Sequence, residues 1–124
     1  MLRVLLACGD MAFCESLREF FEAQKDLSVC AVTTSDVDAV RKAIKCSPDL
    51  IILEMEFSSK TGLDIPAALK IARPRIPVFL ITSNIDVYAE KEALSQGVDA
   101  VFDKGQDFSS LLMNARSVGG LDDG

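Results

Sequence analysis

The sequence predicts a doubly wound α/β fold, in which five parallel strands form one sheet and five helices cover its two faces. Two observations predict this fold. Short apolar runs alternate along the chain with segments whose apolar residues recur at helical spacing. Several of the runs are continuous rather than alternating, which is typical of strands covered on both faces. The chain has 124 residues, of which 49% are hydrophobic, and this is enough for one domain with a full core.

Five apolar runs are the expected strands. The first begins at the second residue, and it is too short and too interrupted by charge at Arg3 to be a secretion signal. Because parallel strands need crossover connections, a helix is expected after each run. In chain order the expected strands are Leu2–Ala7, Leu27–Val32, Leu50–Leu53, Val78–Thr82 and Ala100–Phe102.

The segments after the runs have helical periodicity, and each is expected to bury one apolar stripe. Ser35 is expected to cap the start of the second helix, and Gly97 fits the C-terminal cap of the fourth. The third helix follows Thr61–Gly62 and has Pro66 in or near its first turn, where proline is tolerated best. From first to fifth, the stripes are Phe13, Leu17, Phe20 and Phe21; Val37, Val40 and Ile44; Leu63, Ala67 and Ile71; Ile85, Ala89 and Ala93; and Phe108, Leu111, Leu112 and Ala115.

Right-handed crossovers favour the strand order 2-1-3-4-5, the flavodoxin-like arrangement. In such a sheet, ligands bind at the carboxyl edge, in a crevice beside strands 1 and 3. The loops after those two strands carry three acids, so we expect Asp10, Glu54 and Glu56 to lie near one another. A carboxylate at this edge is a candidate active group.

Three segments, in order and at matching spacing, resemble the receiver domain of bacterial two-component response regulators (CheY-like) over residues 2–116. The resemblance implies that Glu54 stands at the phosphoacceptor position, Thr82 at the switch hydroxyl and Lys104 at the lysine of the phosphate site. The segments that carry it are Ser47–Glu54, Ile76–Ser83 and Gly97–Lys104.

Several positions depart from the family pattern, in which the phosphoacceptor is an aspartate rather than Glu54. The family places two acids after the first strand to hold magnesium, and here Cys8 and Gly9 take those positions, with Asp10 one residue further on. Val101 stands at the aromatic switch position, and Gly105 stands where the family has proline. The chain therefore resembles an atypical or degenerate receiver.

From these departures we expect a non-enzymatic signalling module (a pseudo-receiver) that acts in phosphorelay signalling through protein contacts and without phosphorylation. Thiol and glycine supply no hard oxygen for magnesium, and a glutamate nucleophile reaches about one bond too far for a transfer that relies on positioning. The Glu54 carboxylate is expected to reach toward Lys104 and Thr82 as a partial mimic of the modified state. Two alternatives stay open: a receiver that is still phosphorylated with magnesium, and a flavodoxin-like cofactor-binding protein.

Each candidate residue also has a plain structural reading. Glu54 could be a solvated loop acid, and Thr82 only a hydroxyl at a strand end. Asp10 could serve as a helix N-cap rather than a metal ligand. Lys104 is expected to pair with a crevice carboxylate. Weak magnesium binding by Asp10, Glu54 and Glu56 is the only cofactor expectation.

Composition excludes several other classes of function. A net charge of −6 argues against direct binding to nucleic acid or to an anionic membrane. The chain has no histidine, and its four cysteines form no CxxC pair, so zinc sites of Cys/His type are excluded. The cysteines are expected to be reduced thiols of a cytoplasmic protein, and they are Cys8, Cys14, Cys30 and Cys46.

We expect one receiver-like domain over residues 1–118 and a flexible tail over residues 119–124. The chain is expected to be either a stand-alone receiver or a fragment of a larger regulator. Its expected partner is a protein: a histidine kinase, an output domain or another signalling protein. The resemblance points to a face formed by residues 86–96 and 106–117, where Tyr88 is either an anchor or an ordinary exposed tyrosine. The same face could support a homodimer.

Overall fold

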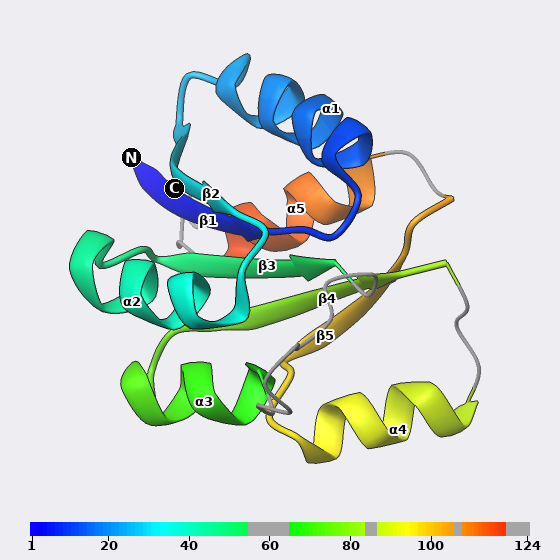
Figure 1. Ribbon diagram of the computed structural model, residues 1–124. Coiled ribbons are helices and arrows are strands. Elements are labelled where there is room, and N and C mark those ends of the chain that lie inside the picture. Colours follow the sequence, from blue (N-terminus) through cyan, green and yellow to red (C-terminus); the bar gives the residue numbers. More distant parts are fainter. Residues whose placement is uncertain (55–64, 84–86, 106–107, 119–124) are drawn as a thin grey trace.

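The fold is a five-stranded parallel sheet between two layers of helices, as Figure 1 shows for the computed structural model. The structure describes residues 1–54, 65–83, 87–105 and 108–118. The strands are β1 (Leu2–Ala7), β2 (Leu27–Thr33), β3 (Leu50–Glu54), β4 (Val78–Thr82) and β5 (Ala100–Asp103). The helices are α1 (Met11–Glu22), α2 (Asp36–Cys46), α3 (Ile65–Ala72), α4 (Val87–Ser95) and α5 (Ser109–Val118).

The strand order is β2-β1-β3-β4-β5, and all four pairings are parallel, which confirms the predicted fold class. Each strand agrees with its expected range to within one residue, because a continuous apolar run marks a buried strand at both ends. Helices α1 and α5 cover one face of the sheet, and α2, α3 and α4 cover the other (Figure 1). No helix in the described ranges is long and apolar enough to cross a membrane.

The edge strand β2 carries an irregularity. Val29 lies opposite Val4, but Ala31 lies opposite Leu5, so Cys30 is an extra residue with no opposite number in β1. Beside it, Lys42 of α2 donates a hydrogen bond to the Val32 carbonyl of β2 at 3.1 Å. The edge strand is therefore bulged and partly covered by a lysine.

The two faces of the sheet have cores of different composition. The α1–α5 side is rich in phenylalanine: Phe21 is fully buried, Phe79 nearly so, and Phe13, Phe20 and Phe108 pack against them. The α2–α4 side is instead rich in alanine, with Ala39, Ala43 and Ala93 buried beside larger aliphatic residues of the sheet.

The helix stripes were predicted correctly on the phenylalanine side, and so was Ala93 of α4 on the alanine side. Leu17, Phe21, Leu111, Leu112 and Ala115 are buried as expected.

On the alanine side the predicted stripes of α2 and α3 are mostly wrong, although Val40 is partly buried against the core. The helices bury Ala39 and Ala43, and Ile65 and Leu69, while the expected core residues Val37, Ile44 and Ile71 are 54%, 55% and 81% exposed. The face of α2 that packs on the sheet thus carries alanines, and the larger side chains of Val37 and Ile44 lie on its exposed faces. Leu63, Thr61–Gly62 and Ile85 lie outside the described residues, as does the side chain of Ala89.

The predicted helix caps are confirmed. Ser35 is the N-cap of α2 and its side chain accepts a hydrogen bond from the Asp38 N–H. Gly97 follows α4 with a φ of +103°, a backbone conformation that favours glycine. Pro66 is the second residue of α3, where its missing N–H has no partner to lose.

Candidate functional site

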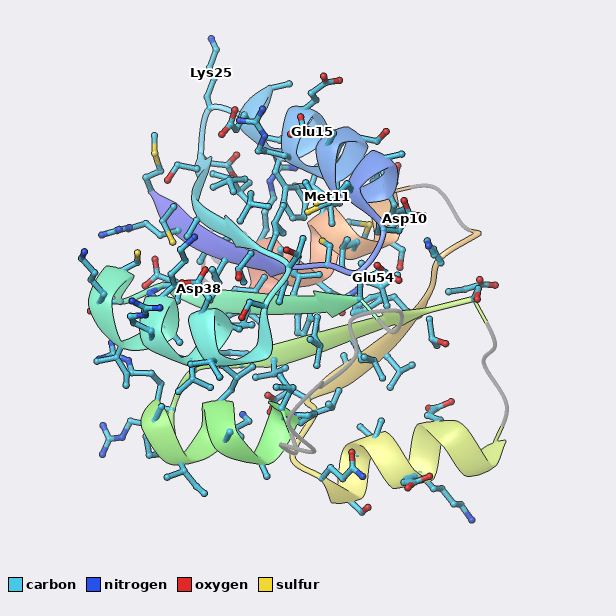
Figure 2. The ribbon with its side chains drawn as sticks, viewed as in Figure 1. Asp10, Met11, Glu15, Lys25, Asp38 and Glu54 are labelled. Atoms are coloured by element: carbon cyan, nitrogen blue, oxygen red, sulfur yellow. The ribbon has the colours of Figure 1, made fainter. Side chains whose placement is uncertain are left out.

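Four strands deliver side chains to one place at the carboxyl edge of the sheet. Cys8 follows β1, Glu54 ends β3, Thr82 ends β4, and Lys104 follows β5. The parallel registers set Glu54 opposite Ile81 and Thr82 opposite Asp103, so the strand ends are level with one another. Figure 2 shows Asp10 at the start of α1 and Glu54 at the tip of β3 close together at this edge. The predicted proximity of Asp10 and Glu54 is thus present in the fold, and Lys104 joins them.

Glu54 is the most enclosed charged side chain of the described residues, with 1% of its surface exposed. One carboxylate oxygen, Oε1, accepts hydrogen bonds from the backbone N–H of Gly9 at 2.9 Å and of Asp10 at 2.8 Å. The other oxygen, Oε2, lies 3.5 Å from the Nζ atom of Lys104. Because both oxygens have partners, the burial of this carboxylate is compensated. The reading of Glu54 as a solvated loop acid is therefore wrong.

Lys104 sits between two carboxylates and above a ring. Its Nζ atom donates to Asp10 Oδ2 at 3.0 Å, lies near Glu54 Oε2, and is 4.9 Å from the centroid of the Phe13 ring. Its backbone N–H donates to the Thr82 carbonyl at 2.8 Å, which fixes the loop after β5 against β4. Its side chain is 15% exposed. The ammonium is therefore held by charge on one side and by the face of an aromatic ring on the other.

Asp10 joins the loop after β1 to the helix that follows. Its Oδ1 atom accepts from the Phe13 N–H at 3.2 Å, so Asp10 is the N-cap of α1. The hydrogen bond from Lys104 holds the pKa of the Asp10 carboxyl below its usual value, and the Phe13 N–H lowers it further. Of the two roles left open by the sequence, the structure shows the capping role.

Two buried thiols lie on either side of the loop that Glu54 holds, Cys8 just after β1 and Cys14 in α1. Cys8 and Cys14 are 0% and 1% exposed. A hydrogen bond with Cys14 raises the pKa of the Cys8 thiol, and burial raises it further, so Cys8 stays a neutral thiol. At the position where receivers have an acid, this chain thus has a small uncharged core residue.

The described residues do not fit magnesium held by the acids of the family pattern. Cys8 offers a buried neutral thiol, Gly9 offers no side chain, and both oxygens of Asp10 and of Glu54 already have partners. Within the ranges that the structure describes, no group of three or more Cys, Asp or Glu side chains could hold a metal ion. Glu56 lies outside those ranges, so the weak site of Asp10, Glu54 and Glu56 stays a prediction.

The remaining site candidates are placed as follows. Thr82 is 2% exposed at the tip of β4, and Val101 is half-buried against the alanine-side core. The side chain of Tyr88 lies outside the described part of α4. Sequence reasoning missed Phe13 as a neighbour of Lys104 and missed the backbone N–H groups of the β1–α1 loop as partners of Glu54. The position of Phe13 three residues after an N-capping Asp10 was the available signal for the first.

Residues 4–116 match the family model of the response regulator receiver domain. The chain belongs to this family. Response regulator protein VraR of Staphylococcus epidermidis is 30% identical over 84 residues, which are 68% of this chain and 40% of that protein. The chain therefore spans 40% of the length of the first curated relatives that it matches.

Solved structures show the same fold. A two-component response regulator of the LuxR family from Aurantimonas sp. SI85-9A1 superposes with a TM-score of 0.85 at 16% identity, covering 95% of this chain and 85% of that one. A CheY-like receiver domain protein from Methanospirillum hungatei JF-1 gives 0.84 at 16% identity, covering 99% and 98%. The predicted resemblance to a CheY-like receiver is thus confirmed, and the chain is a receiver domain of two-component signalling. Such domains act by interacting with kinases and output domains.

Proposed function

We propose that this receiver domain signals through protein contacts without accepting a phosphoryl group, and that Glu54 permanently occupies the place of the phosphorylated side chain. On this proposal the domain is a cytoplasmic, non-enzymatic module. Its partner is a histidine kinase, an output domain or another signalling protein, and it has no direct contact with nucleic acid or membrane.

The observation that carries the proposal is the bonding of Glu54. A carboxylate that attacks phosphorus needs an oxygen that is open to the donor, and a transferring phosphoryl group needs positive charge placed around it. Here one oxygen faces two N–H groups, the other faces Lys104, and 1% of the side chain is exposed. The ammonium of Lys104 is already shared between Glu54 and Asp10. The carboxylate that would act as the nucleophile and the ammonium that would stabilise the phosphoryl group are therefore already paired with each other.

The test is incubation with a small phosphodonor and magnesium, read by intact mass. We expect no gain of a phosphoryl group by the wild-type protein. A matched control combines Cys8→Asp, Gly9→Asp and Glu54→Asp, which restores an acid at each of the three family positions, and its folding is checked by circular dichroism. A phosphoryl group on wild-type protein would overturn the proposal.

The mimicry has a test of its own. Glu54→Gln keeps the length of the side chain and an oxygen for the two N–H groups, but it removes the charge that faces Lys104. We expect this variant to bind the partner more weakly than wild type, with a changed environment at Lys104 seen by NMR of the lysine Nζ group. Equal affinity of the two proteins would leave Glu54 as a structural residue only.

A further inference from the structure

Positive charge is segregated on this acidic chain. Residues 41–48 and 65–76 contain six of the 13 Lys and Arg residues and none of the 19 Asp and Glu residues. These segments are the second half of α2 with its following turn, and α3 with the turn into β4. A chain with a net charge of −6 thus has one region of the opposite sign.

Helices α2 and α3 lie side by side on one face of the sheet, as Figure 1 shows. Both run against the strands, so their C-terminal ends meet at the amino edge of the sheet, away from Glu54. Cations at these ends interact favourably with the helix dipoles, and Lys45 and Lys70 lie in the last turns. The positive region is therefore continuous across two neighbouring elements.

Two isoleucines lie on the adjoining flanks of these helices. Lys42 reaches back to β2, and Lys70 reaches Asp99 beside β5, so these two side chains mark the outer flanks of the helix pair. Ile44 is two residues from Lys42 and so lies on the other flank of α2. Ile71 is turned about 100° from Lys70 around α3, away from β5 and toward α2. Ile44 is 55% exposed and Ile71 is 81% exposed.

Several cations around these isoleucines are not neutralised. Lys42 pairs with Asp38, and Lys70 pairs with Asp99. Among the described residues, no ion-pair partner is recorded for Lys45, Arg73 or Arg75. A surface hollow lies at the C-terminal end of α3 and the turn that follows, and its walls are Ala72, Arg73, Pro74, Arg75 and Ile76.

We propose that the surface formed by Ile44, Lys45, Ile71, Arg73 and Arg75 (the α2–α3 surface) docks an acidic amphipathic segment of a protein partner. Exposed isoleucines are ordinary when single, but here two lie on adjoining flanks of neighbouring helices whose C-terminal ends carry unneutralised cations. Apolar side chains of the segment cover the isoleucines, and its carboxylates face Lys45, Arg73 and Arg75. Complementary charge gives such a contact its orientation and a fast association rate.

A protein segment fits this surface better than nucleic acid or a membrane does. The rest of the chain is strongly acidic and would repel a long phosphate backbone or an anionic bilayer, whereas a short segment meets only the local positive charge. Isoleucine also adds nothing to phosphate binding. The inference rests on the proposed function only in assuming that this domain works through protein contacts, and the surface lies at the opposite edge of the sheet from Glu54.

The test uses a fluorescein-labelled synthetic helix with leucine at i, i+3, i+4 and i+7 and glutamate on both flanks. Binding is measured by fluorescence anisotropy on the full chain. Two control peptides replace either the glutamates by lysine or the leucines by serine. We expect both controls to bind at least about tenfold more weakly than the acidic amphipathic peptide. Equal binding of the three peptides, or no binding of any of them, would overturn the proposal.

Matched variants locate the contact. Ile44→Ser with Ile71→Ser, and Arg73→Glu with Arg75→Glu, are each expected to weaken binding about tenfold. Leu94→Ser with Met113→Ser removes exposed apolar side chains from α4 and α5 and should leave binding unchanged.

Other occupants give different results. Tighter binding of a DNA duplex or of anionic vesicles, lost in the Arg73→Glu and Arg75→Glu variant, would overturn the assignment to a protein segment. Self-association lost in the same variant would place a second copy of this chain on the surface and would likewise overturn it. Phosphorylation is measured separately, so the proposed function and this inference fail independently.

Discussion

Two lysines stand at opposite edges of one sheet, and each joins a carboxylate to nearby elements. At the amino edge, Lys70 contacts Asp99 at 2.6 Å and the Ile76 carbonyl at 3.0 Å, and Asp99 accepts the Val78 N–H at 2.8 Å. At the carboxyl edge, Lys104 lies between Asp10 and Glu54. The side chain of Asp99 is 45% exposed, whereas that of Glu54 is 1% exposed.

This difference in exposure indicates that the carboxyl edge has a role beyond holding the fold together. An exposed ion pair is sufficient to hold a turn against a strand, and the Lys70–Asp99 pair is of this kind. Enclosing a carboxylate costs desolvation energy that such a tie does not require. The enclosed charge lies where parallel α/β folds bind ligands. This contrast supports the proposed function, in which the Glu54 cluster takes part in signalling, and it leaves the Lys70 cluster as a structural contact.

The largest expected contrast is in stability after removal of each carboxylate. Glu54→Ala leaves the N–H groups of Gly9 and Asp10 without their acceptor in an enclosed place and removes one of the two carboxylates beside Lys104, so we expect a loss of about 3 kcal/mol in unfolding free energy. Asp99→Ala should cost about 1 kcal/mol, since water can replace the exposed carboxylate. Urea denaturation of both variants measures the difference. Equal losses would break the comparison.

A smaller effect is expected at Gly97, which supports the amino-edge cluster. Its φ of +103° is unfavourable for a residue with a side chain, and an added Cβ would lie 3.2 Å from Cγ of Lys70. We expect Gly97→Ala to cost about 1–2 kcal/mol in unfolding free energy. The Gly105→Ala variant is the matched control, because there the nearest atom is a side-chain oxygen of Asp103 at 3.5 Å. A neutral Gly97→Ala variant would contradict the strained turn.

Salt should separate the two ion pairs further. In a double-mutant cycle, the Lys70–Asp99 coupling is expected to be below about 1 kcal/mol and to fall in 1 M salt, where the Debye length is about 3 Å. The Lys104–Glu54 coupling should fall much less, because ions do not reach an enclosed pair. Unfolding free energies of the single and double variants at low and high salt give both couplings. An equal salt response at the two edges would remove the distinction.

The smallest effect is expected in the loss of unfolding free energy at acidic pH. The folded chain holds the pKa of Asp10 below its usual value through Lys104, and it does the same for Asp26 through Arg116 and Asp38 through Lys42. The unfolded state therefore binds more protons near pH 4, so this stabilisation is complete above the unfolded pKa of about 3.9 and is lost as pH falls through the lower folded values. Asp10→Asn should make the unfolding free energy depend less on pH in this acidic range, as measured by acid titrations followed by circular dichroism. An unchanged pH dependence of stability would show that Asp10 does not contribute to it.

The strands and the proximity of the loops after β1 and β3 were predictable from the sequence, because continuous apolar runs fix a buried parallel strand and its carboxyl end. The pairing of Lys104 with crevice carboxylates followed from charge alone. The hydrogen bonds from the backbone N–H groups of Gly9 and Asp10 to Glu54 were not predictable, because the identity of a residue does not indicate the direction of its backbone N–H.

The rotation of α2 and α3 was also not predictable from spacing. On α2, both Val37 with Ile44 and Ala39 with Ala43 have the spacing of one helix face. Hydrophobicity alone favours the larger residues as the buried pair, and that choice is wrong. The helix packs its small residues, Ala39 and Ala43, against the sheet. The exposed aliphatic residues that result, Ile44 among them, are the ones from which the α2–α3 surface is built.

The bulge at Cys30 also bears on how these molecules behave at high concentration. An open sheet border of seven uncharged residues is a template on which another chain can add a strand. The extra residue interrupts the regular spacing of N–H and carbonyl groups midway along that border, and Lys42 occupies the Val32 carbonyl beside it. An incoming strand would lose its register at Cys30, which disfavours growth of the sheet beyond β2.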